Sequence, residues 1–267
     1  MDETIQLGFL ALSVDRLIAT IAIMVFVTVA TLLADALRLR PARISRALVL
    51  GIVVSRLVYV LIHRAAYAAE PWSALALWQG GFTLWPGVIA AALVLGWRAA
   101  PWRKSAMLAA VPVVVALAWL GAQSLLATPP RPLPSGLQVE TMDGKPMRLD
   151  ELRGRPLVIN LWASWCPPCR REMPMVIDVA SRSSVPILLV NQGEDAGDIR
   201  RFLADHHLAH GAVLRDPAAS IGAAIRSPAL PATIFVDARG KVRERHIGEI
   251  SRAALMTEIA KLEGKSS

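Results

Sequence analysis

The two cysteines of this chain, Cys166 and Cys169, lie three positions apart in the segment Trp-Cys-Pro-Pro-Cys. They follow an apolar run and precede a stretch with helical spacing, so the pattern predicts a strand-to-helix junction at Cys166. Two cysteines are too few for a disulfide scaffold, and a structural zinc site usually needs more ligands. The spacing therefore predicts a redox-active dithiol.

The residues around the cysteines favour the same chemistry. Cys166 is the predicted nucleophile, because unpaired backbone N–H groups at a helix start stabilise a thiolate. Cys169, one turn into the helix, is then the resolving thiol that attacks a mixed disulfide and releases the reduced partner. Pro167 and Pro168 remove N–H groups that a helix start leaves unpaired in any case. We expect a redox-active Cys166–Cys169 disulfide and no other cofactor.

Three histidines, His206, His207 and His210, form a small cluster. A helix would place His206 and His210 one turn apart, which is compatible with a metal site or with an exposed helix end. No carboxylate or thiol pattern accompanies them, so we predict an exposed helix end and no metal site.

Strand and helix patterns alternate from residue 136 onward. Apolar runs over 156–162 and 185–190 are typical of buried parallel strands. The cysteine helix begins at Cys166 and runs to about Val179, with Pro174 as a kink. Further strands are expected at 137–141, 147–149, 212–214, 232–236 and 242–247, and further helices at 198–206, 217–225 and 252–262. The pattern predicts an α/β domain with a mixed sheet covered on both faces.

The first half of the chain is much more apolar. Four uncharged or nearly uncharged runs, at 17–34, 47–62, 82–97 and 106–127, are candidates for membrane spans. The first follows acidic rather than basic residues, so a cleaved signal peptide is not expected. The prolines of 128–134 predict an extended, semi-rigid spacer. We therefore predict an α-helical membrane domain over 1–127 with about four transmembrane helices, a proline-rich linker over 128–135 and the α/β domain over 136–267.

Charge placement indicates the orientation in the membrane. The net charge is +6 over residues 1–135 and +2 over residues 136–267, so the basic excess is not the footprint of a nucleic-acid site. The loops after the first and third runs carry seven basic residues, namely Arg38, Arg40, Arg43, Arg46, Arg98, Arg103 and Lys104. The positive-inside rule places both loops in the cytoplasm and the cysteine pair outside it, where disulfides persist. Arg56, inside the second run, is expected either to snorkel to the interface or to have a function.

The segment from Asn160 to Pro174, with Leu230-Pro-Ala-Thr233 and Asp237-x-x-Gly240 after it, resembles a known family. It is similar to the membrane-anchored TlpA/ResA-like thiol–disulfide oxidoreductases of thioredoxin fold, over residues 136–265. The resemblance implies a thioredoxin-like domain in which Cys166 and Cys169 are catalytic.

The same resemblance implies roles for residues near the dithiol. Glu172 would line a cavity and influence proton transfer there; the alternative is a solvated helix carboxylate. Asn160 occupies the place where ordinary thioredoxins have a buried aspartate. Pro231 would be the family's cis-proline, which with Leu230 exposes backbone to a substrate. Trp165 is expected at an exposed rim that contacts substrates together with Pro167 and Pro168.

A second resemblance covers roughly residues 5–97. The stretch Gly51 to Tyr59, followed by Trp78-Gln-Gly-Gly81 and Pro86-Gly87, resembles part of bacterial prolipoprotein diacylglyceryl transferase. That family has a histidine needed for activity where this chain has Trp85. The resemblance therefore implies a truncated relative used as an anchor.

These expectations combine into one function. We predict a multi-pass protein of the bacterial inner membrane whose periplasmic domain reduces disulfides in extracytoplasmic proteins, such as apocytochrome c or copper-site proteins. Its electron donor would be a membrane protein of the DsbD or CcdA type, and membrane lipid would surround the anchor. A disulfide oxidase of the same fold and a non-catalytic scaffold that binds partners are the alternatives.

Overall fold

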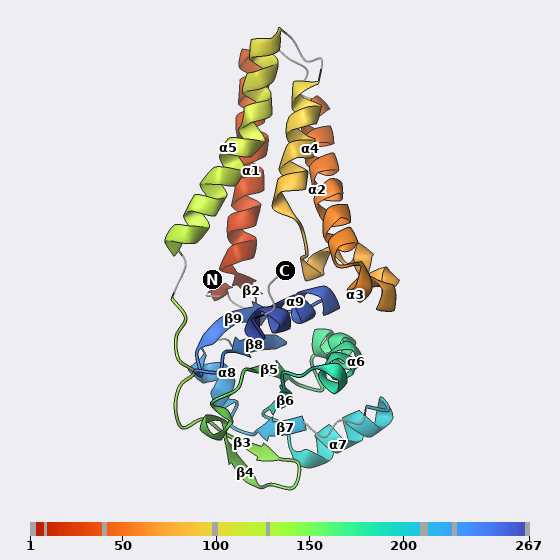
Figure 1. Cartoon of the computed structure of the whole chain (residues 1–267), viewed down its shortest axis with the longest axis vertical. Helices are drawn as coiled ribbons and strands as arrows, with labels where there is room; N and C mark the ends of the chain where they lie inside the picture. Colours follow the sequence, from red (N-terminus) through yellow and green to blue (C-terminus); the bar gives the residue numbers. More distant parts are fainter. Residues whose placement is uncertain are drawn as a thin grey trace. The chain divides into compact units, whose positions relative to one another are not determined.

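The computed structural model describes residues 4–7, 10–38, 42–97, 101–126, 129–208, 213–225 and 229–264. The chain divides into two compact units (Figure 1). One unit is Val14–Ala127, and the other combines Met1–Ser13 with Thr128–Ser267.

The first unit is helical and apolar. Its helices are α1 (Val14–Ala36), α2 (Ala42–Ile62), α3 (Arg64–Ala69), α4 (Leu84–Gly96) and α5 (Trp102–Leu126), and two 3-10 turns, η1 (Pro71–Leu75) and η2 (Leu77–Gln79), lie between α3 and α4. Three segments of the described chain are long and apolar enough to cross a membrane: Leu17–Ala36, Arg43–Ile62 and Trp102–Leu126. The third predicted span differs, because α4 has only 13 residues and is preceded by turns rather than helix.

Small residues allow the helices of this unit to approach closely. A Cβ atom on Gly87 of α4 would lie 2.6 Å from the carbonyl oxygen of Gly51 on α2, so the two backbones are nearly in contact there. Ala30, Ala47 and Ala91 are buried in the same unit. Figure 1 shows α4 beside α2 and α5 beside α1. Close backbone approach of this kind is how helices associate where lipid removes the hydrophobic driving force.

The second unit is built on a seven-stranded sheet of order β4-β3-β7-β6-β5-β8-β9. The strands are β3 (Gln138–Thr141), β4 (Pro146–Arg148), β5 (Leu157–Trp162), β6 (Ile187–Gln192), β7 (Val213–Asp216), β8 (Ala232–Val236) and β9 (Val242–Ile247). The pairs β5–β6 and β6–β7 are parallel, and the other pairs are antiparallel. The predicted mixed sheet is therefore present, with β5 and β6 in its centre.

Helices cover both faces of this sheet. They are α6 (Pro167–Arg182), α7 (Ala196–Asp205), α8 (Ser220–Ala224) and α9 (Arg252–Leu262), with a 3-10 turn at Leu149–Leu152. Val158 of β5 packs in one core with residues of α6, α7 and α9, whereas Ile159 packs in a second core with residues of α8. Successive residues of a strand point to opposite faces, so a strand that is buried on both faces reads as a continuous apolar run.

Local patterns predicted most of these bounds to within a few residues, and the structure differs from the prediction in three places. The helix after Cys166 continues through Pro174 to Arg182. A short hairpin, β1 (Thr4–Leu7) with β2 (Leu10–Ser13), precedes α1 and was not expected.

The third difference concerns the proline-rich segment, which is docked on the second unit rather than a free spacer. Pro132 forms a bridge with Lys241, and the Leu133 N–H donates to Gly240 O at 2.8 Å. The Leu133 side chain is buried in the second core. The proposed linker limits of 128–135 remain a prediction.

Candidate active site

The cysteine pair lies where β5 ends and α6 begins. Cys166 is the N-cap of α6, with an extended backbone (φ −91°, ψ 106°), and its Sγ accepts a hydrogen bond from Cys169 N at 3.3 Å. Pro167 occupies the first helical position, where a missing N–H costs nothing. The two cysteines form a disulfide with a Cα–Cα distance of 5.3 Å. The predicted strand-to-helix junction is thus present, and both sulfurs are within bonding distance.

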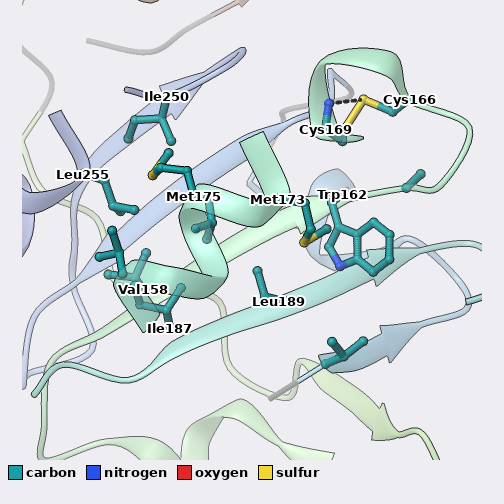
Figure 2. Packing of buried hydrophobic residues seen from close by; sticks show 14 of the residues in the cluster. Val158, Trp162, Cys166, Cys169, Met173, Met175, Ile187, Leu189, Ile250 and Leu255 are labelled. Carbon is teal, nitrogen blue, oxygen red and sulfur yellow. Dashed lines mark hydrogen bonds between the residues drawn. A yellow bond between two sulfur atoms is a disulfide. The ribbon is translucent and has the colours of Figure 1, made fainter. Parts of the chain in front are cut away.

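The disulfide lies over the larger of the two cores. Trp162 and Met173 are fully buried in the same cluster as both cysteines (Figure 2). Cys169 is completely buried and Cys166 is 3% exposed. By contrast, Trp165 is 67% exposed directly before Cys166. Trp165 is thus exposed beside the cysteine pair, as predicted.

The Leu230–Pro231 peptide bond is cis. Pro231 directly precedes β8, and Ala232 of β8 pairs with Leu161 at the end of β5, so Pro231 lies at the edge of the sheet from which the cysteine loop leaves. Pro231 is buried and its carbonyl oxygen accepts from Gly248 N at 2.8 Å, while Leu230 is half-buried. The sheet therefore brings Leu230 and Pro231 to the same edge as the cysteines.

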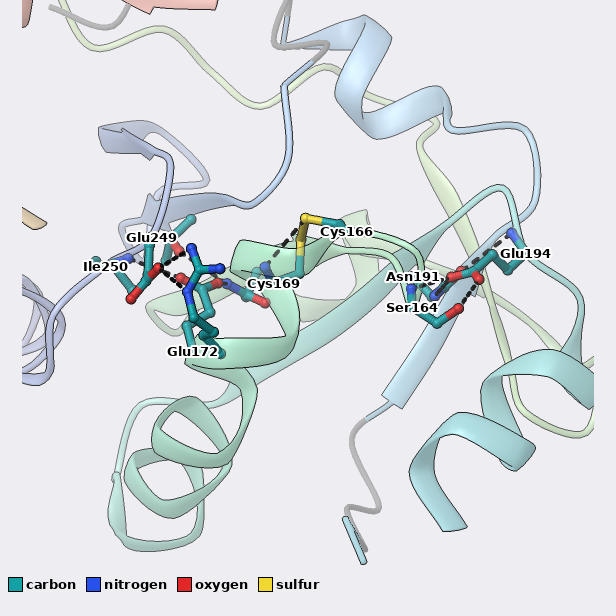
Figure 3. The surroundings of a disulfide bond; sticks show 11 residues. Ser164, Cys166, Cys169, Glu172, Asn191, Glu194, Glu249 and Ile250 are labelled. Atoms are coloured by element: carbon teal, nitrogen blue, oxygen red, sulfur yellow. Dashed lines mark hydrogen bonds and ion pairs between the residues drawn. A yellow bond between two sulfur atoms is a disulfide. The ribbon is translucent and has the colours of Figure 1, made fainter. Parts of the chain in front are cut away.

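Glu172 is buried, which excludes the solvated-carboxylate alternative. Only 3% of the residue is exposed, although it lies on an amphipathic helix. Its Oε1 accepts from Asn160 Nδ2 at 2.9 Å, and its Oε2 accepts from Ile250 N at 2.9 Å. Since Glu172 follows Cys169 by three residues, the two side chains share one face of α6 (Figure 3).

The environment of Glu172 makes it a weak acid. Burial raises its pKa from 4.5 to about 7, because a buried carboxylate loses its hydration, and the nearby Glu249 carboxylate adds to the rise. The bonds from Asn160 and Ile250 oppose the shift by stabilising the ionised form. A group with a pKa near neutrality can both accept and release a proton under physiological conditions.

Asn160 connects Glu172 to β8. Its Nδ2 donates to Glu172 and also to Thr233 Oγ1 at 3.1 Å, whereas its Oδ1 is buried with no hydrogen-bond partner in the described part of the chain. A half-turn of the amide would present Oδ1 to a protonated Glu172 in place of Nδ2. The Asn160 amide can thus donate a hydrogen bond to the ionised Glu172 or accept one from the protonated Glu172.

A second carboxylate, Glu194, holds the loop that precedes Cys166, and sequence reasoning missed it. Glu194 accepts hydrogen bonds from the backbone N–H of Ser164 at 2.7 Å, from the Ser164 hydroxyl and from Asn191 Nδ2 at 2.6 Å. It lies on the opposite side of the disulfide from Glu172 (Figure 3). Only the sequence Asn191-Gln-Gly-Glu194 after an apolar strand could have indicated it, and that pattern also fits an ordinary turn.

The two arginines after Cys169 each contact another side chain. Arg171 forms an ion pair with Glu249 at 2.8 Å, and Arg170 Nη2 lies 3.1 Å from His206 Nε2. His206 and His207 are exposed, as predicted, whereas His210 lies outside the described residues. The described residues contain no group of three or more side chains suited to holding a metal ion.

A cysteine pair at a helix start on a mixed sheet, next to a cis-proline and a buried acid, defines a thioredoxin-like thiol–disulfide oxidoreductase. Residues 130–262 match the family model described as Redoxin. The chain is 30% identical over 131 residues to the thiol:disulfide interchange protein DsbE of Pseudomonas fluorescens biotype C, and the match covers 49% of this chain and 72% of that protein. The chain is 31% identical over 156 residues to the DsbE homologue of Paracoccus denitrificans, and the match covers 55% of this chain and 86% of that protein. The chain belongs to this family of thiol–disulfide oxidoreductases.

Three further matches each cover one part of the chain. The thiol-disulfide oxidoreductase ResA of Bacillus cereus is 28% identical over 127 residues, covering 46% of this chain and 73% of that protein. The solved structure of DsbF of Mycobacterium tuberculosis is 28% identical, with a TM-score of 0.46, and the match covers 49% of this chain and 98% of that one. Residues 3–124 match the family model of prolipoprotein diacylglyceryl transferase, which agrees with the resemblance seen in the sequence.

Proposed function

We propose that this protein is a membrane-tethered reductase of disulfides in extracytoplasmic proteins, with Cys166 as nucleophile, Cys169 as resolving thiol and Glu172 as proton acceptor. The observation that carries the proposal is the buried acid one helical turn beyond Cys169, whose pKa is raised to about 7 by burial. A resolving thiol inside the protein needs a nearby base, because the thiolate and not the thiol attacks a disulfide.

The proposed reaction balances in two exchanges. The Cys166 thiolate attacks one sulfur of a substrate disulfide, and the other substrate sulfur leaves as a thiolate and takes up a proton. Cys169 then gives its proton to the Glu172 carboxylate and attacks Sγ of Cys166. The mixed disulfide breaks, and the remaining substrate sulfur leaves as a thiolate that is protonated in turn. Two electrons pass to the substrate, and Cys166 and Cys169 end as a disulfide.

The substrate would bind over the rim formed by Trp165, Pro167 and Pro168 and along the backbone at Leu230 and Pro231. Exposed Trp165 offers a large, rigid apolar contact at low entropic cost. Since Pro231 has no N–H and its carbonyl oxygen already accepts from Gly248 N, the backbone groups of Leu230 would pair with a substrate strand and so orient the target sulfur. Apocytochrome c and copper-site proteins are the proposed substrates, and a membrane protein of the DsbD or CcdA type is the proposed donor that returns the disulfide to the dithiol.

The assignment of roles is tested by trapping. A Cys169→Ala variant should accumulate mixed disulfides with its partners, because Cys166 attacks and nothing resolves the product. A Cys166→Ala variant should accumulate none. Non-reducing gels of membranes, followed by identification of the trapped proteins, measure both. Equal trapping by the two variants would contradict the roles given to the cysteines.

The direction of electron flow is a separate measurement. If the protein is a reductase, its electron donor keeps the dithiol reduced. Thiol trapping of the wild-type protein in growing cells should then find Cys166 and Cys169 mostly reduced. A mostly oxidised pair would favour the oxidase of the same fold. A scaffold without catalysis predicts that replacing both cysteines leaves the cellular phenotype unchanged.

A further inference from the structure

Arg56 lies within α2, six residues before the helix ends at Ile62, and only 5% of it is exposed. Snorkelling to the interface is therefore not what this arginine does. Its Nε donates to Ala74 O at 3.0 Å, its Nη1 donates to Gly80 O and to Gly81 O (2.9 Å), and its Nη2 donates to Ser73 O at 2.9 Å and to Ala76 O at 3.4 Å. A guanidinium has five N–H groups, and these five bonds use all of them.

All five acceptors belong to the stretch that contains η1 and η2, here called the turn segment (residues 71–82). The guanidinium also lies 5.4 Å from the ring centroid of Tyr67 and 5.6 Å from that of Phe82. Gly80 and Gly81 both have positive φ, and a Cβ atom on Gly81 would lie 2.7 Å from Arg56 Nη1. The two glycines thus allow the chain to turn its carbonyl groups toward the arginine.

The outer side of the turn segment has the opposite character. Trp72 is 84% exposed, Leu75 72%, Leu77 52% and Trp78 63%, whereas Ala76 between them is buried. No charged residue occurs between Glu70 and Arg98. The segment therefore has polar backbone groups turned inward to Arg56 and large apolar side chains turned outward.

Helix lengths place this segment at the depth of the membrane. Along α2, Arg56 lies about 9 Å before Ile62, so the carbonyl groups that it binds lie beside the last turns of α2 and not beyond them. The 13 residues of α4 extend only about 20 Å, whereas the hydrocarbon core of a bilayer is about 30 Å thick. The Thr83 N–H donates to Ser55 O at 3.1 Å, which fixes the start of α4 next to Arg56.

We propose that the turn segment is a re-entrant membrane segment. It completes the short α4 span inside the bilayer, its Trp72, Leu75, Leu77 and Trp78 side chains contact lipid, and Arg56 supplies the hydrogen bonds that water would supply elsewhere. Irregular backbone at membrane depth requires such internal partners, because an unsatisfied carbonyl group in hydrocarbon is costly. Since all five N–H groups of Arg56 are used, the arginine is a structural donor and not a site for a lipid phosphate. The proposal is independent of the redox chemistry of the second unit.

The test uses the full-length chain with Cys166→Ser and Cys169→Ser, so that an introduced cysteine is the sole thiol. Leu75→Cys is compared with Leu57→Cys on an exposed face of α2 and with Lys145→Cys at an exposed turn of the second unit. The proteins are reconstituted in phosphatidylcholine–phosphatidylglycerol vesicles and treated with a membrane-impermeant maleimide. We expect Leu75→Cys and Leu57→Cys to react at least about tenfold more slowly than Lys145→Cys, because the bilayer excludes the reagent. Reaction of Leu75→Cys at the rate of Lys145→Cys would place the segment in water and overturn the proposal.

Spin labels at the same positions identify what covers the segment. Collision with dissolved oxygen, which concentrates in lipid, should be as frequent at Leu75→Cys as at Leu57→Cys. Infrequent collision with both oxygen and a water-soluble nickel chelate would mean that protein covers the segment, and lipid would be wrong as its partner.

The role of Arg56 is tested by adding Arg56→Gln to the Leu75→Cys chain, with Arg64→Gln, at an exposed position of α3, as the matched control. Loss of the carbonyl partners should raise maleimide labelling at Leu75→Cys by about tenfold, and Arg64→Gln should leave it unchanged. Unchanged labelling in Arg56→Gln would show that the arginine does not hold the segment. If Arg56→Gln does not accumulate, Arg56→Lys is used in its place; it keeps the charge but loses the fork of donors, and it should raise labelling in the same direction.

Discussion

The carboxyl group of Glu172 combines burial, two hydrogen bonds and a nearby like charge. Its acceptors are used by Asn160 Nδ2 and Ile250 N, so the ionised form is supported but not solvated. Burial dominates and raises its pKa to about 7. We expect an ionisable group so placed to affect both the stability of the fold and the rate of thiol exchange, and the two effects can be measured separately.

The first effect is on stability as a function of pH. The folded pKa of Glu172 lies above its unfolded value of 4.5, so the folded state binds the proton more tightly, and stability falls as pH rises from about 4.5 to about 7. The shift corresponds to roughly 3 kcal/mol as an upper figure. Glu172→Gln should remove this part of the pH dependence in the oxidised protein, and Glu151→Gln, at an exposed position, should not. Thermal unfolding between pH 4.5 and 8 measures it; parallel curves for wild type and Glu172→Gln would contradict the prediction.

The second effect is on the exchange rate. If Glu172 accepts the proton of Cys169, Glu172→Gln should slow disulfide exchange and change its pH profile, while the Cα positions of the cysteines stay as they are. The titrations of Glu172 and of the two thiols are coupled, so the pH profile reports apparent pKa values of the three groups together and not of one residue. Stopped-flow exchange with a model disulfide across pH 5–9 is the measurement. Superimposable profiles would mean that the buried acid has no part in the chemistry.

At the scale of elements, the loop between β5 and α6 is held from both sides. α6 fixes Cys166 and Cys169, and Glu194, at the junction of β6 and α7, binds Ser164 two residues before Cys166. Three donors converge on the Glu194 carboxylate, so removing it leaves partly buried N–H groups without an acceptor. The position of Cys166, the proposed nucleophile, therefore depends on a residue that lies outside the cysteine motif.

The neighbouring residue offers a matched control for this role. Glu194→Ala should lower stability by about 1–3 kcal/mol and slow exchange by freeing the loop. Asp195→Ala removes the cap of α7, which accepts from Gly197 N and Asp198 N, and should cost about 1 kcal/mol without slowing exchange. Urea unfolding measures the loss of stability in the two variants, and disulfide exchange rates measure whether only Glu194→Ala slows the reaction. A rate loss that is equal in both variants would show that Glu194 acts only through general stability.

At the scale of the whole molecule, the chain joins a redox domain to an apolar helical unit, and the side of the membrane decides which disulfides it meets. Seven basic residues lie in the loops after α1 and α4 or in the first turns of the helices that follow them, and the positive-inside rule predicts the orientation from these charges. Both loops follow helices that run in the same direction through the membrane, so they lie on one side if α1, α2, α4 and α5 all cross.

An orientation with both loops in the cytoplasm and the redox domain in the periplasm predicts the outcome of reporter fusions. An enzyme reporter that is active only in the periplasm should be active when it is fused after Gly264 and inactive when it is fused after Arg40. The physical reason is that short loops rich in arginine are retained in the cytoplasm. Activity of the Arg40 fusion with an expressed but inactive Gly264 fusion would reverse the orientation and with it the proposed substrates.

The sequence by itself indicated a thiol–disulfide oxidoreductase with Cys166 and Cys169 as its cysteine pair, and it predicted nearly all the elements around them. Strand and helix periodicities are local, so the bounds of β8, β9 and α9 follow from neighbouring residues alone. The cysteine spacing, the apolar runs and the Leu-Pro-Ala-Thr segment are likewise local signals. They were sufficient for the class of fold and for the position of the cysteine pair at a strand-to-helix junction.

Only the tertiary structure decided what surrounds those residues. Glu172 could be a solvated or a buried acid until Asn160 of β5 and Ile250, 78 residues away, were seen to enclose it. Glu194 and Ser164 are 30 residues apart, and Arg56 reaches carbonyl groups 17 to 25 residues further on. Burial and hydrogen-bond partners depend on contacts between distant segments, which no window of sequence contains, so the environment that sets a pKa or holds a loop becomes visible only once the chain has folded.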